Sequence, residues 1–468
     1  MSSSMSEQDI AAALARVEDC LGAERPREAV ADLNRILAAI PNHPMALCGV
    51  GRVSIQLGDN NAALQALDLA LQGAPGLPEA RNARGVALQN LGRLDDAEAE
   101  FRHVVAAFPD NPGALVNLAS LLAAKGAFAD AETTFQRVLD LTPGDATAGY
   151  NLGLLHLLQG DLASGWRGFE QRARASNVGL AGIRSQAPRW TGEVLPDATL
   201  LVHAEQGLGD NIQFVRYVSA VADRVGTVIL EAPEPLVDLF RQVPGPAQVI
   251  ARGAPLPAHD LHIPIMSLPA AFTTTVDTIP WNGPYLSADP GRVGDWRKRL
   301  GPDDGRMQVG LVWAGNPGHK RDRDRSIPLS DLAPLLDVDG VAFHALQVDA
   351  ATNQIFRAPF KGRMGRLFQR LLPFTEVAAA VTALDLVIGV DTSMVHLAGA
   401  LGRPVWTLIS HVPDWRWMLS RDDSPWYPTM RLFRQPAPGD WPSVAGDVAD
   451  ALTKAAAGFA GGGNREAR

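Results

Sequence analysis

The sequence predicts an α plus α/β protein, with an all-α repeat array followed by a parallel-sheet region of two lobes. Two observations lead to this division. A 34-residue period runs through residues 6–176, and beyond it short β-branched runs alternate with helical stretches. The chain has 468 residues, which is too long for one hydrophobic core, so several folding units are expected.

The first part of the chain repeats four columns of residues at a spacing of 34. They are Pro41, Pro75, Pro109 and Pro143; Ala29, Ala63, Ala97 and Ala131; Gly58, Gly92, Gly126 and Gly160; and Gly51, Gly85, Ala119 and Gly153. Small side chains let paired helices approach, glycine favours a left-handed C-cap, and proline ends a helix. The pattern resembles the tetratricopeptide repeat, in which helical hairpins stack into a superhelix, with three full repeats over residues 44–145.

Asn117 and Asn151 are also 34 residues apart and occupy the same place on successive first helices. A side-chain amide both donates and accepts, so a ladder of asparagines can clamp a peptide backbone. The arrays of O-linked N-acetylglucosamine transferases, which this half resembles, use asparagines similarly. Gly49 and Ala83 occupy the earlier rungs, and the alternative is that both asparagines only cap or bridge helices.

The second part of the chain carries the signature of parallel sheets with crossover helices. A proline-rich stretch over 280–302 divides it into two Rossmann-like lobes, 185–300 and 301–456, followed by a flexible tail over 457–468. Ligands bind such lobes beyond the carboxyl ends of the strands. The expected strands are Thr199–His203, Thr227–Glu231, Leu261–Ile265, Val309–Ala314, Ala342–Val348, Leu384–Val390 and Val405–Ile409.

The first strand-to-loop junction contains Gln206, Gly207, Gly209 and Asp210. Two glycines permit a tight loop, and Asp210 stands at the start of the helix that follows. A carboxylate facing the cleft can take the proton of an acceptor hydroxyl. The alternative is that Asp210 is only a helix cap.

The second junction carries His319, Lys320 and Arg325 among interleaved acidic residues. Cations near the cleft can neutralise a departing diphosphate, and we expect Lys320 and Arg325 to do so. The alternative is a solvated, self-paired charged loop. Asp322 and Asp324 are crowded by arginines, so we expect no metal site there.

The third junction runs from Asp391 through Thr392 and Ser393 to His396. Thr392 and Ser393 begin a helix whose free amides and positive dipole end favour a phosphate. His396 follows Thr392 by four residues and therefore lies on the same helical face. The alternative is that Asp391 is a plain cap and His396 is packed.

Together these junctions resemble the heptosyltransferase-like glycosyltransferases, a GT-B family with two Rossmann-like lobes. The Asp391 segment is similar to that family's donor-binding region, and the Asp210 loop to the loop whose aspartate is taken as the catalytic base. The chain as a whole resembles bacterial tetratricopeptide-repeat glycosyltransferases. Further matching segments are 203–206, 313–317, 414–417 and 424–427, and the resemblance adds Asn316 and Asp391 to the donor-binding residues.

Two further features carry weaker signals. Trp415, Trp417, Trp426 and Tyr427 can stack on a sugar or base, although packing is the expected use for most of them. The stretch 356–370 holds five basic residues and departs from the relatives' shorter loop. It is a mobile lid, an acceptor-contacting patch or an ordinary solvated insertion.

The bulk composition narrows the class of protein. A formal net charge of −9 argues against general nucleic-acid binding, and two cysteines exclude a disulfide framework. Residues 1–15 show no basic segment before an apolar core, and no apolar run is long enough to span a membrane. We therefore expect a cytoplasmic protein with no membrane span and no nucleic-acid partner.

The resemblance implies a metal-independent, inverting glycosyltransferase that needs no cofactor and uses a nucleotide sugar as donor. We expect the repeats to select a protein acceptor; surface proteins such as flagellin are candidates, although no residue selects one. Two alternatives remain: a lipid-linked or polysaccharide acceptor, and a scaffold with an inactive transferase-like domain. The sequence names neither the sugar, nor the nucleotide, nor the oligomeric state.

Overall fold

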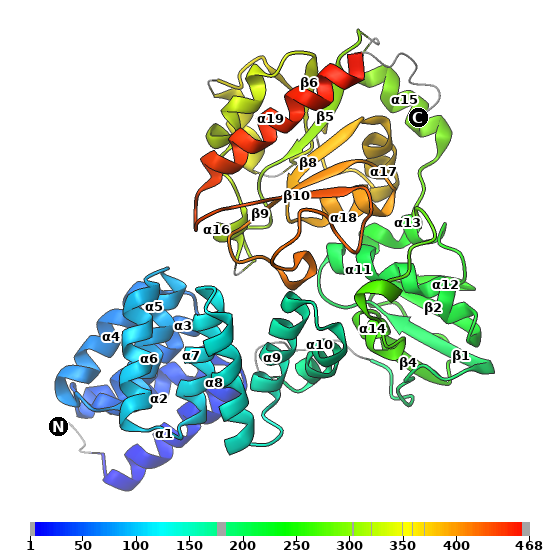
Figure 1. The fold of residues 1–468 in the computed structure, drawn as a ribbon. Helices are drawn as coiled ribbons and strands as arrows, with labels where there is room; N and C mark the ends of the chain where they lie inside the picture. Colours follow the sequence, from blue (N-terminus) through cyan, green and yellow to red (C-terminus); the bar gives the residue numbers. More distant parts are fainter. Residues whose placement is uncertain are drawn as a thin grey trace. The chain divides into compact units, whose positions relative to one another are not determined.

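The computed structural model describes residues 5–175, 184–301, 304–319, 321–348, 350–357, 359–368 and 370–460. It divides into two compact units. The first contains Met1–Leu155 with Arg174–Val178, and the second contains His156–Ala173 with Gly179–Arg468. The cores of the two units have different architectures, helical in the first and α/β in the second (Figure 1).

The first unit is a stack of antiparallel helix pairs (Figure 1). Proline stands at the first helical position of three successive first helices, at Pro44, Pro78 and Pro112, where its missing N–H costs no hydrogen bond. The helices are α1 (Glu7–Gly22), α2 (Pro26–Ala39), α3 (Pro44–Gln56), α4 (Asn60–Gly73), α5 (Pro78–Asn90), α6 (Leu94–Ala107), α7 (Pro112–Ala124), α8 (Phe128–Leu141) and α9 (Ala146–Gln159), whose end belongs to the second unit.

The glycine columns have the roles that their spacing predicts. The column from Gly58 to Gly160 is left-handed throughout, with φ between 79° and 93°, and each member lies just after a first helix. The other column lets helices touch: a Cβ at Gly51 would lie 2.5 Å from Leu67 Cγ, and one at Gly85 would lie 2.4 Å from Phe101 Cε1. Both predictions are confirmed.

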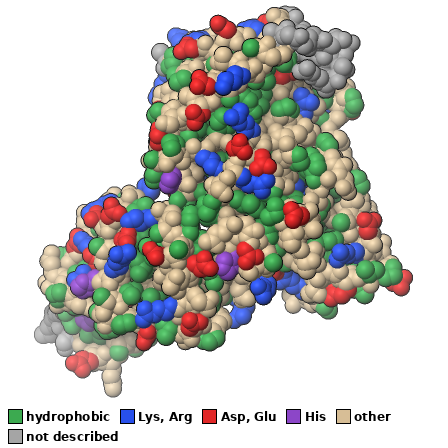
Figure 2. Space-filling model, viewed as in Figure 1, with side chains coloured by type: hydrophobic (Ala, Val, Ile, Leu, Met, Phe, Trp, Pro, Cys, Tyr) green, Lys and Arg blue, Asp and Glu red, His purple; other side chains and the backbone are tan. Residues whose placement is uncertain are grey.

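Charged residues cover the outside of these helices. Arg84 bridges Asp68 and Glu100 across neighbouring helices, at 2.7 and 2.6 Å. On the face drawn in Figure 2, basic and acidic side chains are interspersed rather than gathered by sign. Such a surface suits a binding array that is not a general phosphate binder.

The first lobe of the second unit is built on a four-stranded parallel sheet of order β3-β2-β1-β4. Strands β1 and β2 lie at the centre of this sheet, where both faces of a strand are covered. This is why both strands carry runs of buried apolar residues. Its strands are β1 (Leu195–His203), β2 (Val225–Ala232), β3 (Gln248–Ala251) and β4 (Leu261–Pro264), and its helices are α11 (Leu208–Phe214), α12 (Val218–Ala222), α13 (Val237–Phe240) and α14 (Leu268–Ala271).

The second lobe is built on a six-stranded parallel sheet of order β10-β9-β8-β5-β6-β7. Helix α19 lies across this sheet and contributes Val444, Val448 and Leu452 to its core (Figure 1). The strands are β5 (Met307–Val312), β6 (Val341–Ala345), β7 (Met364–Arg366), β8 (Leu386–Val390), β9 (Val405–Ile409) and β10 (Met430–Arg434); the helices are α15 (Pro290–Leu300), α16 (Asp322–Arg325), α17 (Phe374–Ala383), α18 (Ser393–Ala400) and α19 (Trp441–Ala460).

The fold class is the one that the sequence predicts, and all seven expected strands are present within a few residues. Strands β3, β7 and β10 were not expected. Each is at a sheet edge, and they have four, three and five residues. Edge strands that short bury little apolar surface, so their hydrophobic pattern is weak.

Among the described residues, no helix has the length and apolar character needed to span a membrane.

Candidate active site

Asp210 lies where strand β1 passes into helix α11. Gly207 is the N-cap of α11, and Asp210, three residues later, accepts a hydrogen bond from the Gly207 N–H at 2.8 Å through its Oδ2. The residue before this turn, Gln206, is exposed and has φ of +55°, which is uncommon for a residue with a Cβ. Strained backbone of this kind gathers at functional sites.

The other oxygen of Asp210 faces a buried arginine. Asp210 Oδ1 forms an ion pair with Arg416 Nη2, and Arg416 Nη1 lies 2.9 Å from Asp414 Oδ1. Arg416 Nε donates to Gln213 Oε1 in helix α11. Burial disfavours the arginine's charge, but Asp414 and Asp210 outweigh burial and raise the pKa of Arg416. The carboxylate that sequence reasoning singles out is therefore held on both oxygens.

Helix α18 begins at the carboxyl end of strand β8, with Thr392 as its N-cap. His396 is buried in this helix: its Nδ1 lies 2.9 Å from Tyr427 Oη, and its Nε2 lies 3.8 Å from Asp391 Oδ1. Burial opposes ionisation of Asp391, but the interaction with His396 outweighs it and lowers the pKa of the carboxyl. Both ring nitrogens thus face protein groups, so a phosphate contact from His396 stays a prediction.

Thr392 brings an unused polar group to the same place. Among the residues that the structure describes, its buried Oγ1 has no hydrogen-bond partner. Buried hydroxyls are nearly always paired, so an orphaned one at a helix N-terminus fits a ligand oxygen. Ser393, the first helical residue, is partly exposed beside it.

The two lobes meet at Gly209 and His396. A Cβ at Gly209 would lie 2.9 Å from His396 Cδ2 and 3.5 Å from Ser393 Cα. Only a residue without a side chain lets α11 approach α18 this closely. The first-lobe loop with Asp210 and the second-lobe helix with Thr392 and Ser393 therefore lie directly against each other.

The loop after strand β5 is tied to the same site by Arg325. Its Nη1 donates to the Asp391 carbonyl at 3.0 Å, and its Nε lies 3.2 Å from Asp322 Oδ1. Burial, assisted by Arg325, lowers the pKa of His319. Asn316 accepts from the Gly318 N–H at 2.9 Å and shapes this loop. Lys320 lies outside the described residues.

The aromatic residues of the last loops are packed. Trp415, Trp417, Trp426 and Tyr427 are at most 6% exposed, which confirms the expectation that most of them serve packing. Trp417 stacks on His396 with ring centroids 5.4 Å apart. Sequence reasoning named these rings but missed Arg416, which lies in their midst.

The basic stretch 356–370 contains the edge strand β7, which pairs with β6. Part of the stretch is therefore sheet rather than lid. Arg363 donates to the Leu336 carbonyl, and Arg366 donates to the Phe368 carbonyl at 2.8 Å. Phe356, its first residue, is 58% exposed, and Leu371, just after it, is 81% exposed.

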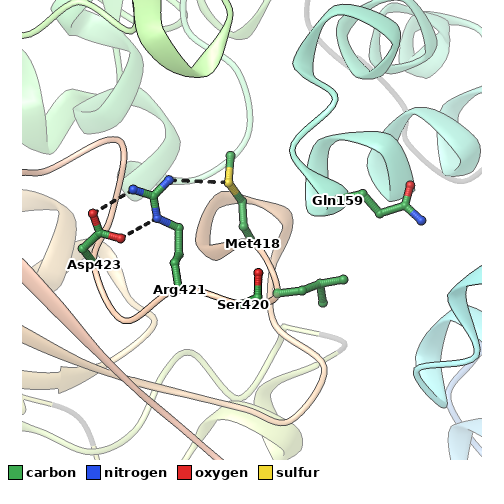
Figure 3. Close-up of a pocket in the computed structure, with 6 residues that line it drawn as sticks. Gln159, Met418, Ser420, Arg421 and Asp423 are labelled. Carbon is green, nitrogen blue, oxygen red and sulfur yellow. Dashed lines mark hydrogen bonds and ion pairs between the residues drawn. The ribbon is translucent and has the colours of Figure 1, made fainter.

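A pocket of about 440 Å³ in the second unit is lined by Gln159 and by residues of 418–423. Figure 3 shows Arg421 between Asp423 and Met418, with Gln159 across from Met418. Arg421 pairs with Asp423 at 2.6 Å, so its charge is already neutralised. This pocket includes none of the predicted site residues.

The repeat asparagines link successive first helices. Asn117 Nδ2 donates to Asn82 Oδ1 at 2.9 Å, and Asn151 Nδ2 lies 3.4 Å from Ser120 Oγ. Each of these asparagines donates one side-chain N–H to a residue on the preceding first helix. A side-chain amide also has a second N–H and a carbonyl oxygen that can bind a peptide. Asn82 and Ser120 therefore join Asn117 and Asn151 in one row of polar side chains along the first helices. Neither of them was predicted from the sequence.

Family models match both parts of the chain. A model described as "Tetratricopeptide repeat" matches residues 14–78, 82–146 and 126–177. A model described as "Glycosyltransferase family 9 (heptosyltransferase)" matches residues 368–427, which include Asp391, His396 and Arg416. The chain thus carries tetratricopeptide repeats together with a glycosyltransferase family 9 domain, as its resemblances indicate. Asp210 lies outside the matched residues.

Known proteins similar to the chain include the FlbA protein of Caulobacter vibrioides, 26% identical over 95% of this chain and 74% of that protein. Solved structures similar to it include MamA from Desulfovibrio magneticus RS-1, 20% identical over 37% of this chain and 97% of that one, with a TM-score of 0.29. Pseudomonas aeruginosa pilF is 15% identical over 36% of this chain and 77% of that one, with a TM-score of 0.32.

Proposed function

We propose that the protein is a metal-independent, inverting glycosyltransferase that moves a sugar from a nucleotide sugar to a protein acceptor selected by the repeats. The observation that carries the proposal is the meeting of Gly209 with His396 and Ser393. It joins a carboxylate, Asp210, to a helix N-terminus with an orphaned hydroxyl, Thr392. A base and a phosphate-binding site are the two parts that such a transfer needs.

In the proposed reaction Asp210 takes the proton of the acceptor hydroxyl while that oxygen bonds to the sugar carbon and the bond to the phosphate breaks. Each Asp210 oxygen has two lone pairs and uses one in the contacts with Gly207 and Arg416. An acceptor hydroxyl can therefore reach a second lone pair. Arg416 and the Gly207 N–H fix the direction of the carboxylate. A general base must be held within hydrogen-bond reach of the proton that it takes.

The donor phosphates are proposed to lie against Thr392, Ser393 and the α18 amides, with Asp391, Asn316 and His396 shaping that surface. Arg325, which already contacts the Asp391 carbonyl, is the nearest predicted cation in the described part of the loop. Lys320 is proposed as the second cation. These positive groups would stabilise the leaving nucleotide in place of a metal ion.

The repeats are proposed to hold an extended segment of the acceptor. The row of amides and hydroxyls from Asn82 to Asn151 supports this, because it offers backbone-like donors and acceptors on successive helices. The same proposal divides the chain into a repeat array over 6–176, an acceptor lobe over 185–300 and a donor lobe over 301–456. It also includes a cytoplasmic location.

The proposal is tested by incubating the full chain with a panel of nucleotide sugars and measuring nucleotide release with and without a chelator. Asp210→Asn should abolish transfer while leaving donor binding intact. Asp423→Asn is the matched control, because Asp423 also pairs with an arginine but lies at the other pocket. A fully active Asp210→Asn variant would remove Asp210 as the base.

The acceptor is identified separately, by mass spectrometry of proteins that co-purify with the chain and gain the mass of a sugar. Transfer to a glycan or lipid in place of a protein would leave the enzyme proposal intact and overturn the acceptor. Release of nucleotide from no member of the panel would favour the scaffold alternative.

A further inference from the structure

Arg172 is a buried arginine that the proposed reaction does not use. It lies in the short 3-10 helix η1 (Glu170–Ala173), which follows α10 (Leu162–Phe169), and is 1% exposed. Its Nη2 lies 2.7 Å from Glu205 Oε1 and its Nε lies 3.2 Å from Glu205 Oε2, so the pair is bidentate. Nη2 also donates to Ser267 at 2.6 Å, and Nη1 donates to Glu170 at 2.9 Å.

Glu205 connects this arginine to the active-site loop. It is 4% exposed and directly precedes Gln206, the residue with positive φ. Its side chain also accepts from the Met266 N–H at 3.0 Å, and its carbonyl accepts from Asn211 Nδ2 at 2.8 Å. The same Asn211 nitrogen donates to the Gly207 carbonyl at 2.7 Å. The loop that presents Asp210 is thus anchored at its first residue.

The preceding helix, α10, packs against the loop that holds Arg416, the ion-pair partner of Asp210. Trp166 packs edge-on against Trp415 with centroids 5.4 Å apart, and Phe169 lies 6.1 Å from the same ring. Trp415 is the neighbour of Arg416 in the chain. Trp166 Nε1 also donates to the Thr274 carbonyl at 2.9 Å, which fixes the indole in the first lobe. One helical segment therefore braces both the carboxylate loop and the loop with its arginine partner.

The buried Arg172–Glu205 ion pair is better explained by the fixed positions that it gives its two side chains than by a gain in folding stability. Removing charges from water is costly, and apolar residues of similar size often stabilise a core as well or better. What the bidentate pair adds is a fixed direction for each group. A loop with a strained residue needs such a restraint, because it does not hold its shape by local preference.

We propose that Arg172 is a positioning residue for Asp210: through Glu205 it fixes the loop that presents the carboxylate, so segment α10–η1 is a working part of the catalytic unit. The inference rests on the proposed function, since it concerns how the proposed base is held. It also assigns to residues 162–173 a role that their similarity to the repeats does not suggest.

The first test needs no substrate. The Gly207 N–H donates to Asp210 Oδ2, so its hydrogen exchange reports on the position of the carboxylate. In the full chain, Arg172→Ala should accelerate exchange over residues 205–211 by about 10-fold or more. Arg184→Ala is the matched control: Arg184 bonds the buried Glu231 at 2.7 Å, in strand β2 and outside the loop. It should leave residues 205–211 unchanged.

The second test uses whichever nucleotide sugar of the panel gives release. Arg172→Ala should lower kcat by about 100-fold, because a small misplacement of a reacting group is that costly. The KM for the donor should stay within about 3-fold, since the donor surface lies on the other lobe. Arg172→Lys, which keeps one contact with Glu205, should recover part of the loss. Arg184→Ala should retain full kcat.

The outcomes separate the two proposals. If no member of the panel releases nucleotide, the exchange test still decides whether Arg172 holds the loop. Unchanged exchange in Arg172→Ala, or equal acceleration with Arg184→Ala, would overturn the inference. If Arg172→Ala does not fold, Arg172→Lys and Glu205→Gln carry both tests, and normal exchange together with normal kcat in both would overturn it as well.

Discussion

Asp210 and Arg416 are 206 residues apart in the chain and form an ion pair across the two lobes. The pair joins the end of strand β1 to the loop that follows β9, and both residues also bond helix α11 or its cap. A closed pair of this kind sets the separation of the lobes as well as the direction of the carboxylate.

Replacing Arg416 with alanine should destabilise the second unit by about 3–5 kcal/mol, because it leaves two carboxylates beside a buried amide without their cation. Chemical denaturation followed by tryptophan fluorescence measures this. Arg421→Ala removes a more exposed pair with Asp423 and should cost less than about 1 kcal/mol. Equal losses in the two variants would contradict the role of the cross-lobe pair.

Replacing Gly209 with alanine should push the lobes apart. The new Cβ would lie 2.9 Å from His396 Cδ2, and overpacking of this kind costs about 1–3 kcal/mol. We expect weaker nucleotide-sugar binding in titration calorimetry and a matching fall in kcat/KM. Gly446→Ala in helix α19 meets no atom within 4 Å among the described residues and should leave both unchanged.

Replacing Gly85 with alanine should destabilise the first unit alone. The added carbon would lie 2.4 Å from the buried Phe101 ring, where α5 packs on α6, at a cost of about 1–3 kcal/mol. Thermal unfolding followed by circular dichroism should show the array melting earlier. Gly76→Ala has open space around it in the described structure and is the control. A Gly85→Ala variant as stable as the parent would refute the close helix approach.

Stability should fall between pH 6.5 and pH 5, in part because of His203. Burial, with help from His262, lowers the pKa of His203 from 6.5 to about 3. Below pH 6.5 the unfolded histidine takes up a proton and the folded one does not, so the free energy of unfolding falls as pH falls. The full slope for one group is about 1.4 kcal/mol per pH unit.

The His203→Gln variant should show a shallower loss in urea denaturation at pH 7.5 and pH 5 than the parent. Glutamine retains a group that can bond His262, which lies 3.1 Å from His203. The exposed His103, replaced in the same way, serves as the control and should leave the slope as it is. A parent-like slope in His203→Gln would show that other groups carry the acid sensitivity.

The sequence by itself determined the helical array and the order of the two lobes. Helix ends are set by local chemistry, so Gly58, Pro75 and their 34-residue equivalents mark them without reference to the rest of the chain. The strand-to-loop junctions at Asp210 and Asp391 could also be predicted from the sequence, because glycines and a polar residue after an apolar run indicate the end of a parallel strand.

Only the tertiary structure decided which of these residues meet. Arg416 lies within the matching segment 414–417, but neither its neighbours nor those of Arg172 indicate a partner. The two arginines pair with Asp210 and Glu205 across 206 and 33 positions. The same holds for His396, whose ring is enclosed by Tyr427 and Trp417. Pairing over such separations depends on how the sheets and helices pack, and the free energy of a buried ion pair exists only after that packing has excluded water.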